Sequence, residues 1–381
     1  MSQTSFINAR IATPDGRLIT GTLTCEGETI TAIGDHAATG EIIDVAGGYL
    51  LPGFIDTQVN GGGGVLFNDE TNAAGIAAIG KAHRPYGTTA FMPTLISDEL
   101  SVIDAAMRAT EDAIAQGVPG VLGIHIEGPF ISTQRKGIHN PEMFRTLDAE
   151  SKALLKSLRR GKTMVTLAPE NCTPEDIAEL AQAGVILAAG HTNATYETTV
   201  EALKAGITGF THLFNAMSPF THRAPGVVGA ALEDQTSYTG IIADGHHVDW
   251  AALRIALRTR PLDRFMLVTD AMPTVGSDTK TFVLNGQTII VRDGVCVGPD
   301  GTLAGSDLDM ATAVRNTVNH IGRTLAEAAI MAATAPAHFL GLGASRGSLV
   351  IGQRADIVWM DANLQMKGTF IGAKSEEVLA A

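Results

Sequence analysis

The segment Gly123-Ile124-His125-Ile126-Glu127-Gly128-Pro129-Phe130 is the most informative part of the chain for predicting its architecture. It continues an apolar run over residues 121–126, which predicts a buried strand. The strand must stop at Gly128-Pro129, because proline has no N–H to give to a sheet. Glu127 is then left at the carboxyl end of a buried strand, where an ionised carboxylate needs a cation. An ion pair or a helix cap would meet that need, and so would a metal ion or a role as a catalytic acid.

Eight apolar segments in the middle of the chain predict parallel strands, and helical patterns such as residues 97–116 lie between most of them. Eight strands that alternate with helices are typical of an α/β fold of the (β/α)8 TIM-like barrel type. A doubly wound sheet is the structural alternative, but polar residues recur after nearly every strand, which favours the barrel. The predicted strands are 51–56, 88–92, 121–126, 164–168, 185–189, 209–212, 238–243 and 265–269.

The two ends of the chain differ from this middle part. Residues 1–50 and 344–381 predict short strands separated by turn signals such as Pro14-Asp15-Gly16. We expect them to pair into one small β-sandwich domain, with residues 51–343 forming a catalytic barrel. Residues near 281–300 predict hairpin strands, which we expect to be an insertion after the eighth barrel strand.

Composition narrows the class of protein. The 381 residues are 45% hydrophobic and 18% charged, which excludes a disordered chain, and their net charge of −13 excludes a basic surface for nucleic acid or anionic membrane. Cys25, Cys172 and Cys296 are odd in number and far apart, which argues against a disulfide framework. No signal peptide and no apolar run long enough for a bilayer are evident. We therefore expect a cytoplasmic protein.

Polar residues at the carboxyl ends of the predicted strands suggest a site. In a barrel these ends converge on one face, where active sites lie. Glu127, His191 and His212 follow strands three, five and six, and one carboxylate with two imidazoles is the usual ligand set of a catalytic zinc ion. A single histidine would more often be a core residue, but three such residues together favour a metal site. Asp270 follows the last strand and could be a further ligand or a general base.

Several motifs resemble the N-acetylglucosamine-6-phosphate deacetylase family of the amidohydrolase superfamily. The resemblance extends over nearly the whole chain, and the Glu-Gly-Pro and His-Leu-Phe-Asn-Ala-Met stretches together are strongly specific for it. The motifs are His125-Ile-Glu127-Gly-Pro129, Gly190-His191-Thr-Asn193-Ala194, Thr211-His212-Leu-Phe-Asn215-Ala216-Met217, Gly245-His-His247-Val-Asp249, Val268-Thr-Asp270-Ala271, Leu51-Pro52-Gly53-Phe54-Ile55-Asp56 and Thr302-Leu303-Ala304-Gly305-Ser306.

The resemblance implies a role for each matching residue. Glu127, His191 and His212 would hold one divalent metal ion per subunit, with Zn²⁺ expected and Fe²⁺, Co²⁺ or Mn²⁺ as alternatives. Asp270 would be the catalytic acid and base, and His139 would polarise the acetamide oxygen. The protein would be a homodimer, and its substrate a phosphorylated amino sugar. The substrate would contact Asn215, Ala216, Arg223, His247, Gly137, Ile138, Leu303, Ala304 and Gly305.

One departure from the wider superfamily concerns the first strand. Many members have His-x-His there, which creates a second metal site, whereas this chain has Gln58-Val59-Asn60. Neutral amides are poor ligands for a transition metal. We therefore expect one tightly held metal, with Gln58 and Asn60 close to it.

The activity implied by the resemblance is hydrolysis of N-acetyl-D-glucosamine 6-phosphate to D-glucosamine 6-phosphate and acetate. Alternatives are the N-acetyl-D-galactosamine 6-phosphate, which differs at one hydroxyl, and another amidohydrolase reaction on the same scaffold. A non-catalytic assembly protein on a decayed barrel is a different class. The intact set of Glu127, His191, His212 and Asp270 argues against it.

Overall fold

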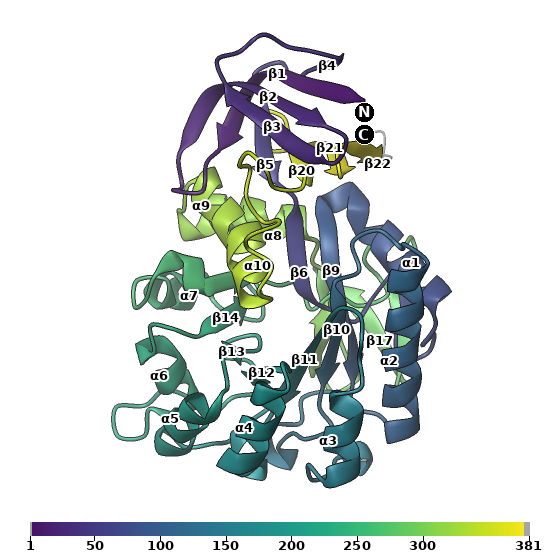
Figure 1. Cartoon of the computed structure of the whole chain (residues 1–381). Coiled ribbons are helices and arrows are strands. Elements are labelled where there is room, and N and C mark those ends of the chain that lie inside the picture. The colour runs from purple at the N-terminus through teal and green to yellow at the C-terminus, as the bar shows by residue number, and fades with distance from the viewer. Residues whose placement is uncertain (1, 377–381) are drawn as a thin grey trace.

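The computed structural model describes residues 2–376 of the chain; Met1 and the last part of the predicted small domain, 377–381, lie outside the described residues. It confirms the predicted fold class. A barrel of parallel strands is surrounded by helices, and a small sheet built from both chain ends lies against one end of it (Figure 1).

The barrel contains eight parallel strands within residues 2–376, in the order β15-β14-β13-β12-β11-β10-β9-β6. The two outermost strands in this order, β6 and β15, join at their carboxyl ends. There Val59 forms a parallel bridge with Ala271, and the N–H of Asp270 donates to the carbonyl of Gln58 at 3.0 Å. The strands are β6 (Phe54–Val59), β9 (Thr88–Ile96), β10 (Gly123–Glu127), β11 (Lys162–Leu167), β12 (Ile186–Ala189), β13 (Gly209–Phe210), β14 (Tyr238–Ile241) and β15 (Phe265–Leu267).

Helices follow the barrel strands and cover their outer faces (Figure 1). Helix α4 illustrates how the sequence starts them: Thr173 and Asp176 form a capping box, Pro174 occupies the first turn, and Ile177 and Leu180 face the core. The helices between strands are α1 (Ala73–His83), α2 (Leu100–Ala115), α3 (Ala149–Leu155), α4 (Pro174–Gln182), α5 (Tyr196–Ala205), α6 (Gly226–Glu233) and α7 (Trp250–Ala256). None of the helices in residues 2–376 combines the length and the apolar character that crossing a bilayer requires.

The small sheet joins the two ends of the chain, in the strand order β22-β21-β20-β5-β1-β2-β3, with β4 also on β1. Phe6 of β1 and Phe370 of β21 lie three strands apart, a distance of about 14 Å in a flat sheet, yet their ring centroids are 4.9 Å apart. The sheet therefore curls around its own apolar core. Its strands are β1 (Gln3–Ala12), β2 (Leu18–Glu26), β3 (Thr29–Gly34), β4 (Glu41–Asp44), β5 (Tyr49–Pro52), β20 (Ile357–Met360), β21 (Met366–Ile371) and β22 (Lys374–Glu376).

The first barrel strand is shorter than the sequence predicts. Leu51 and Pro52 belong to β5, where they pair with β20 of the small sheet, and β6 begins at Phe54. The chain thus passes from one sheet into the other with Gly53 between them. A side chain at Gly53 would come within 2.2 Å of Thr89 Oγ1, so the crossing requires glycine.

After β15 the chain forms an antiparallel sheet and then a group of helices. The sheet consists of β16 (Thr281–Leu284), β17 (Gln287–Arg292), β18 (Val295–Val297) and β19 (Leu303–Ser306), so it extends six residues beyond the predicted end at 300. Its apolar side chains pack on Leu66, Ile96 and Met272 at the barrel mouth. The remaining elements are the hairpin β7 (Gly61–Gly62) and β8 (Val65–Leu66), and helices α8 (Met310–Asn316), α9 (Leu325–Ala329) and α10 (Ala335–Phe339).

Candidate active site at the mouth of the barrel

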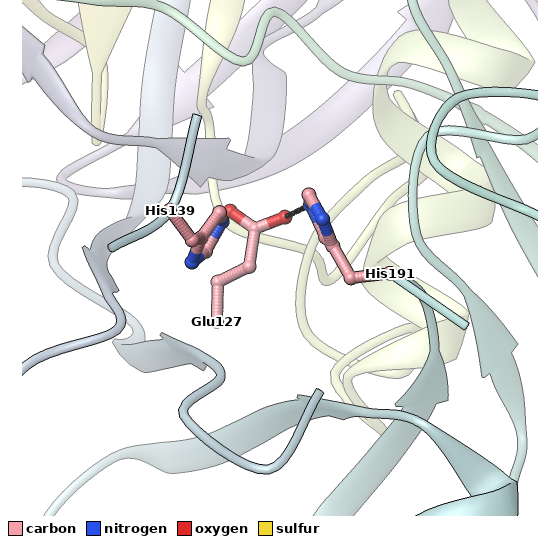
Figure 2. Close-up of side chains that lie close together, drawn as sticks. All are labelled: Glu127, His139 and His191. Atoms are coloured by element: carbon pink, nitrogen blue, oxygen red, sulfur yellow. Dashed lines mark ion pairs between the residues drawn. The ribbon is translucent and has the colours of Figure 1, made fainter. Parts of the chain in front are cut away.

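Three predicted metal ligands meet at the carboxyl ends of the strands. Glu127 is the last residue of β10, and His191 and His212 each lie two residues beyond the end of β12 and β13. Glu127 Oε1 lies 3.3 Å from His191 Nε2 and 3.0 Å from His212 Nε2, and the two imidazole nitrogens are 3.1 Å apart. Figure 2 shows Glu127 pointing between the rings of His191 and His139. One oxygen and two nitrogen atoms that can each bind a metal ion therefore lie close together.

The spacing of these three atoms fits a small divalent cation. Ligand distances of about 2.0–2.1 Å around a tetrahedral zinc ion place neighbouring ligand atoms about 3.3 Å apart. The triangle formed by Glu127, His191 and His212 has edges of 3.0–3.3 Å. Burial of all three side chains leaves the carboxylate with little water to solvate it. The residues therefore fit one face of a metal coordination sphere.

A fourth buried side chain, His139, belongs to the same group: single donor atoms of Glu127, His139 and His191 all lie within 4.8 Å of one another. His191 and His139 differ in the hydrogen bond that each makes at Nδ1. His191 Nδ1 lies 2.9 Å from the carbonyl of Arg135, which can only accept, so His191 carries its proton there and presents a lone pair at Nε2. His139 Nδ1 instead accepts from the backbone N–H of Ser97 at 3.3 Å. A neutral His139 therefore carries its proton at Nε2 and acts there as a donor.

Burial and neighbouring charges shift the pKa values of these residues. Burial alone would raise the pKa of Glu127, but hydrogen bonds from His191 and His212 outweigh it and lower that pKa well below its usual range. Burial would lower the pKa of His212, but Glu127 raises it. Burial and then the neighbouring His191 lower the pKa of His139 to about 3, so His139 is neutral at pH 7.

Asp270 lies beside this group, three residues beyond the end of β15. Its Oδ1 accepts from Asn60 Nδ2 at 2.7 Å and from Gln58 Nε2 at 3.1 Å, and the same Gln58 amide donates to Glu127 Oε1 at 3.1 Å. Burial, and then the charge of Glu127, raises the pKa of Asp270 to about 6. The structure thus places Gln58 and Asn60 directly against the predicted acid and base.

Backbone strain marks the same residues. His191, His212 and Asp270 have φ values of 48°, 32° and 53°, in the left-handed region that side chains disfavour. Each such conformation costs about 1–3 kcal/mol and persists where the surroundings impose it, often at functional sites. The strand ends turn sharply at these residues, which aims the side chains into the barrel mouth.

Most of the predicted substrate-binding residues lie around this group. A side chain at Gly137 would come within 3.2 Å of the His191 ring, and one at Gly305 within 2.8 Å of the Asp270 carbonyl. The carbonyl of Ala216 accepts from the N–H of Thr192, next to His191, and the amide of Asn215 donates to the carbonyl of His212 at 3.2 Å. Leu303 and Ala304 precede Gly305 in β19, and the carbonyl of Ile138 accepts from Asn285.

His247 and Arg223 occupy different surroundings. His247 Nδ1 lies 2.6 Å from Asp244 Oδ2, and both side chains are buried. A positive charge on His247 would lower the pKa of Asp270, in opposition to burial and Glu127. Because a carboxylate oxygen only accepts, Nδ1 of His247 carries a proton. Arg223 is exposed and lines a separate cavity of about 310 Å³ together with Arg135 and Tyr196. No contact with Glu127, His191 or His212 is found for it within residues 2–376.

Two residues that were not predicted, Ser97 and Glu170, form hydrogen bonds that help to position the site. Ser97 contacts His139, and Glu170 contacts the loop that follows His191. Ser97 Oγ lies 2.8 Å from His139 Nδ1, and Glu170 accepts from the N–H of Asn193 at 2.6 Å, two residues from His191. Both residues follow strands, β9 and β11, at whose ends the sequence had suggested no candidate residue. The fourth predicted strand ends two residues before Glu170. The second was predicted to end at 92, whereas β9 extends to Ile96, which places Ser97 directly after it.

The comparisons with known proteins agree with this architecture. Residues 49–380 match the amidohydrolase family. The chain is 42% identical over 329 residues to an N-acetylgalactosamine-6-phosphate deacetylase of Shewanella sp., covering 86% of this chain and 83% of the relative. A crystal structure of N-acetylglucosamine-6-phosphate deacetylase from Pasteurella multocida matches with a TM-score of 0.94 and 35% identity, covering 98% of this chain and 99% of that one.

A further solved structure contains a sugar phosphate. It is a variant of N-acetyl-D-glucosamine-6-phosphate deacetylase from Mycobacterium smegmatis in complex with N-acetyl-D-glucosamine-6-phosphate, with a TM-score of 0.90 and 32% identity over 98% of this chain and 99% of that one. The chain belongs to the amidohydrolase family. Within that family it is similar, over nearly its whole length, to deacetylases of N-acetylated hexosamine 6-phosphates.

Proposed function

We propose that this chain hydrolyses the acetamide of N-acetyl-D-glucosamine 6-phosphate, giving D-glucosamine 6-phosphate and acetate. The observation that carries the proposal is the group of Glu127, His191 and His212, whose donor atoms lie 3.0–3.3 Å apart beside Asp270. Similarity to deacetylases of this kind supports the substrate class.

Glu127, His191 and His212 would hold one divalent cation, for which we propose Zn²⁺. When bound, such a cation supplies Lewis acidity, which acidifies water and polarises a carbonyl group. His139 would donate from Nε2 to the carbonyl oxygen of the acetamide as negative charge develops on it. Its lowered pKa and its bond to Ser97 keep it a neutral donor.

Asp270 would move the proton that the reaction transfers. As a carboxylate it accepts a proton from the attacking water while the new C–O bond forms. It then gives this proton to the nitrogen as the C–N bond breaks, so that the amino sugar leaves as a neutral amine and not as an amide anion. Its position beside Glu127, through the shared amide of Gln58, supports this assignment.

The phosphate needs local positive charge, because the whole chain has a net charge of −13. We assign its recognition to His247, whose ring Asp244 orients, and to Arg223. Since Arg223 is exposed, it has two possible targets, the site of its own subunit or that of a partner in the homodimer that we also propose.

A second candidate substrate is N-acetyl-D-galactosamine 6-phosphate. The observation in its favour is the 42% identity to a deacetylase named for that sugar, compared with 38% for a Bos taurus deacetylase named for the glucosamine epimer. The two sugars differ in the orientation of one hydroxyl group, which loops around the site would discriminate.

The test is acetate release from both sugar phosphates by purified protein, before and after removal of metal with a chelator. We expect turnover of at least one of them that chelation abolishes and added Zn²⁺ restores. Turnover that persists without metal, or none on either sugar, would refute the proposal. Size-exclusion chromatography with light scattering tests the homodimer.

Two further features remain predictions. They are the cytoplasmic location and the division of the chain into a small β domain, residues 1–50 with 344–381, and a catalytic barrel, residues 51–343.

A further inference from the structure

The two oxygens of the Asp270 carboxylate have different surroundings. Oδ1 accepts hydrogen bonds from Asn60 Nδ2 at 2.7 Å and from Gln58 Nε2 at 3.1 Å. Within residues 2–376, no hydrogen-bond donor lies on Oδ2. One oxygen is therefore held by two amides, and the other has no hydrogen-bond partner in the described part of the chain.

Hydrogen bonds on both sides also hold the main chain of Asp270 in place. Its N–H donates to the carbonyl of Gln58 at 3.0 Å, and its carbonyl accepts from Ser306 at 2.8 Å. Its φ of 53° is held between these bonds. Gln58 therefore contacts Asp270 through both its backbone carbonyl and its side chain. The end of β6 in this way fixes the conformation of the segment that follows β15.

The side-chain oxygen of Asn60 has no hydrogen-bond partner within residues 2–376 in this arrangement. Its Oδ1 is buried, and no hydrogen bond reaches it from the described part of the chain. A buried polar atom left unpaired costs about 1–3 kcal/mol. A purely structural position would gain from an apolar residue of similar size, so this cost indicates that the N–H donor is what the position requires.

We propose that Gln58 and Asn60 are positioning residues that reserve Oδ2 of Asp270 for proton transfer. The inference rests on the proposed function, because it assigns the oxygen through which the proposed acid and base acts. Water would give its proton to Oδ2, and the same oxygen would return it to the nitrogen. The amides would hold Oδ1 throughout, so that the carboxylate does not rotate between the two steps.

The variants Asn60→Leu and Gln58→Met remove one donor each and keep the approximate size of the side chain. Loss of orientation of about 1 Å can lower a rate about 100-fold, so we expect kcat to fall about 10–100-fold. KM should change little. Metal content should change little in Asn60→Leu, whereas Gln58→Met also removes a hydrogen bond to Glu127 and should weaken metal binding. Thr57→Val is the matched control, since Thr57 is buried on the same strand and its hydroxyl has no partner in residues 2–376. It should keep wild-type kcat.

A double-mutant cycle with Asp270→Asn decides the matter. If Asn60 acts through Asp270, Asn60→Leu should cause no further loss of kcat in the Asp270→Asn background. Gln58→Met should keep part of its loss there, because the Gln58 amide also donates to Glu127. An equal fold-loss in both backgrounds would overturn the inference. That outcome is distinct from failure of the proposed function, in which wild-type protein releases no acetate. If Asn60→Leu does not fold, Asn60→Ala, which removes the same donor, completes the cycle.

Discussion

Ser97 donates to Nδ1 of His139 from its backbone N–H at 3.3 Å, and its hydroxyl lies 2.8 Å from the same nitrogen. At His191 the corresponding nitrogen faces the carbonyl of Arg135. The two partners impose opposite tautomers on histidines whose ring centroids are 4.4 Å apart. One ring is thereby suited to bind a metal ion and the other to donate a hydrogen bond.

Metal content should therefore separate the histidines. We expect His191→Ala, His212→Ala and Glu127→Gln to lose both metal and activity, because each removes a donor atom from the triangle. His139→Gln, the matched control, should lose activity but retain one metal ion per subunit. Elemental analysis of purified variants measures this. A metal-free His191→Ala protein with full activity would contradict the ligand assignment.

Asp270→Asn keeps the size of the side chain and removes its proton chemistry. We expect kcat to fall by about 10²–10⁴, the usual contribution of general acid–base catalysis, with metal still bound. Steady-state kinetics and metal analysis of the same preparation check this. Wild-type kcat in the variant, or a loss of activity that merely follows loss of metal, would remove Asp270 from the mechanism.

Arg223→Ala should weaken binding of the 6-phosphate by about 1.5–3 kcal/mol, the range for a hydrogen bond to a charged group. Slow turnover of unphosphorylated N-acetylglucosamine provides the control and should barely change. The comparison requires kcat/KM for both sugars. Equal losses on the two substrates would place Arg223 in folding or subunit assembly, in line with its exposed position.

Asp244→Asn tests whether the orientation of His247 matters for the phosphate. Asp244 fixes the ring through the 2.6 Å contact at Nδ1 and also accepts from two backbone N–H groups of the same turn. We expect KM for the 6-phosphate to rise about tenfold, equivalent to roughly 1.4 kcal/mol, while kcat at saturation stays close to that of wild type. An unchanged KM would mean that His247 does not contact the phosphate.

Asp56 should make the stability of metal-free protein depend on pH. Burial raises its pKa to about 7, so the folded state binds a proton more tightly than the unfolded state does. Stability is then highest below the unfolded pKa of about 4 and falls as pH rises towards 7. Asn resembles the protonated form, so Asp56→Asn should gain up to ~4 kcal/mol relative to wild type between pH 4 and pH 8. Urea unfolding at each pH measures the difference, and a constant difference would refute the prediction.

Much of the fold, and the residues that gather at the barrel mouth, could be predicted from the sequence. Buried parallel strands are continuous apolar runs, so all eight were located, and barrel topology then brings their carboxyl ends together. Glu127, His191, His212 and Asp270 follow from that rule combined with the family motifs.

The sequence could not predict which distant segments pair with one another, or which backbone group faces a given side chain. Leu51 and Pro52 fit a barrel strand by hydrophobicity, but their partner is β20, some 300 residues later. The difference between His139 and His191 depends on whether an N–H or a carbonyl faces Nδ1. Composition and spacing carry no information about such an orientation.

The junction between β6 and β15 makes enzymatic activity an indicator of completed folding. Gln58 and Asp270 are 212 positions apart in the chain, and they meet where the first and last barrel strands join. Contacts between such distant segments form late, because the entropy of closing the intervening chain opposes them. During refolding, helical signal and metal binding by Glu127, His191 and His212 should therefore return before acetate release does. A partly assembled intermediate would retain its metal yet be catalytically silent.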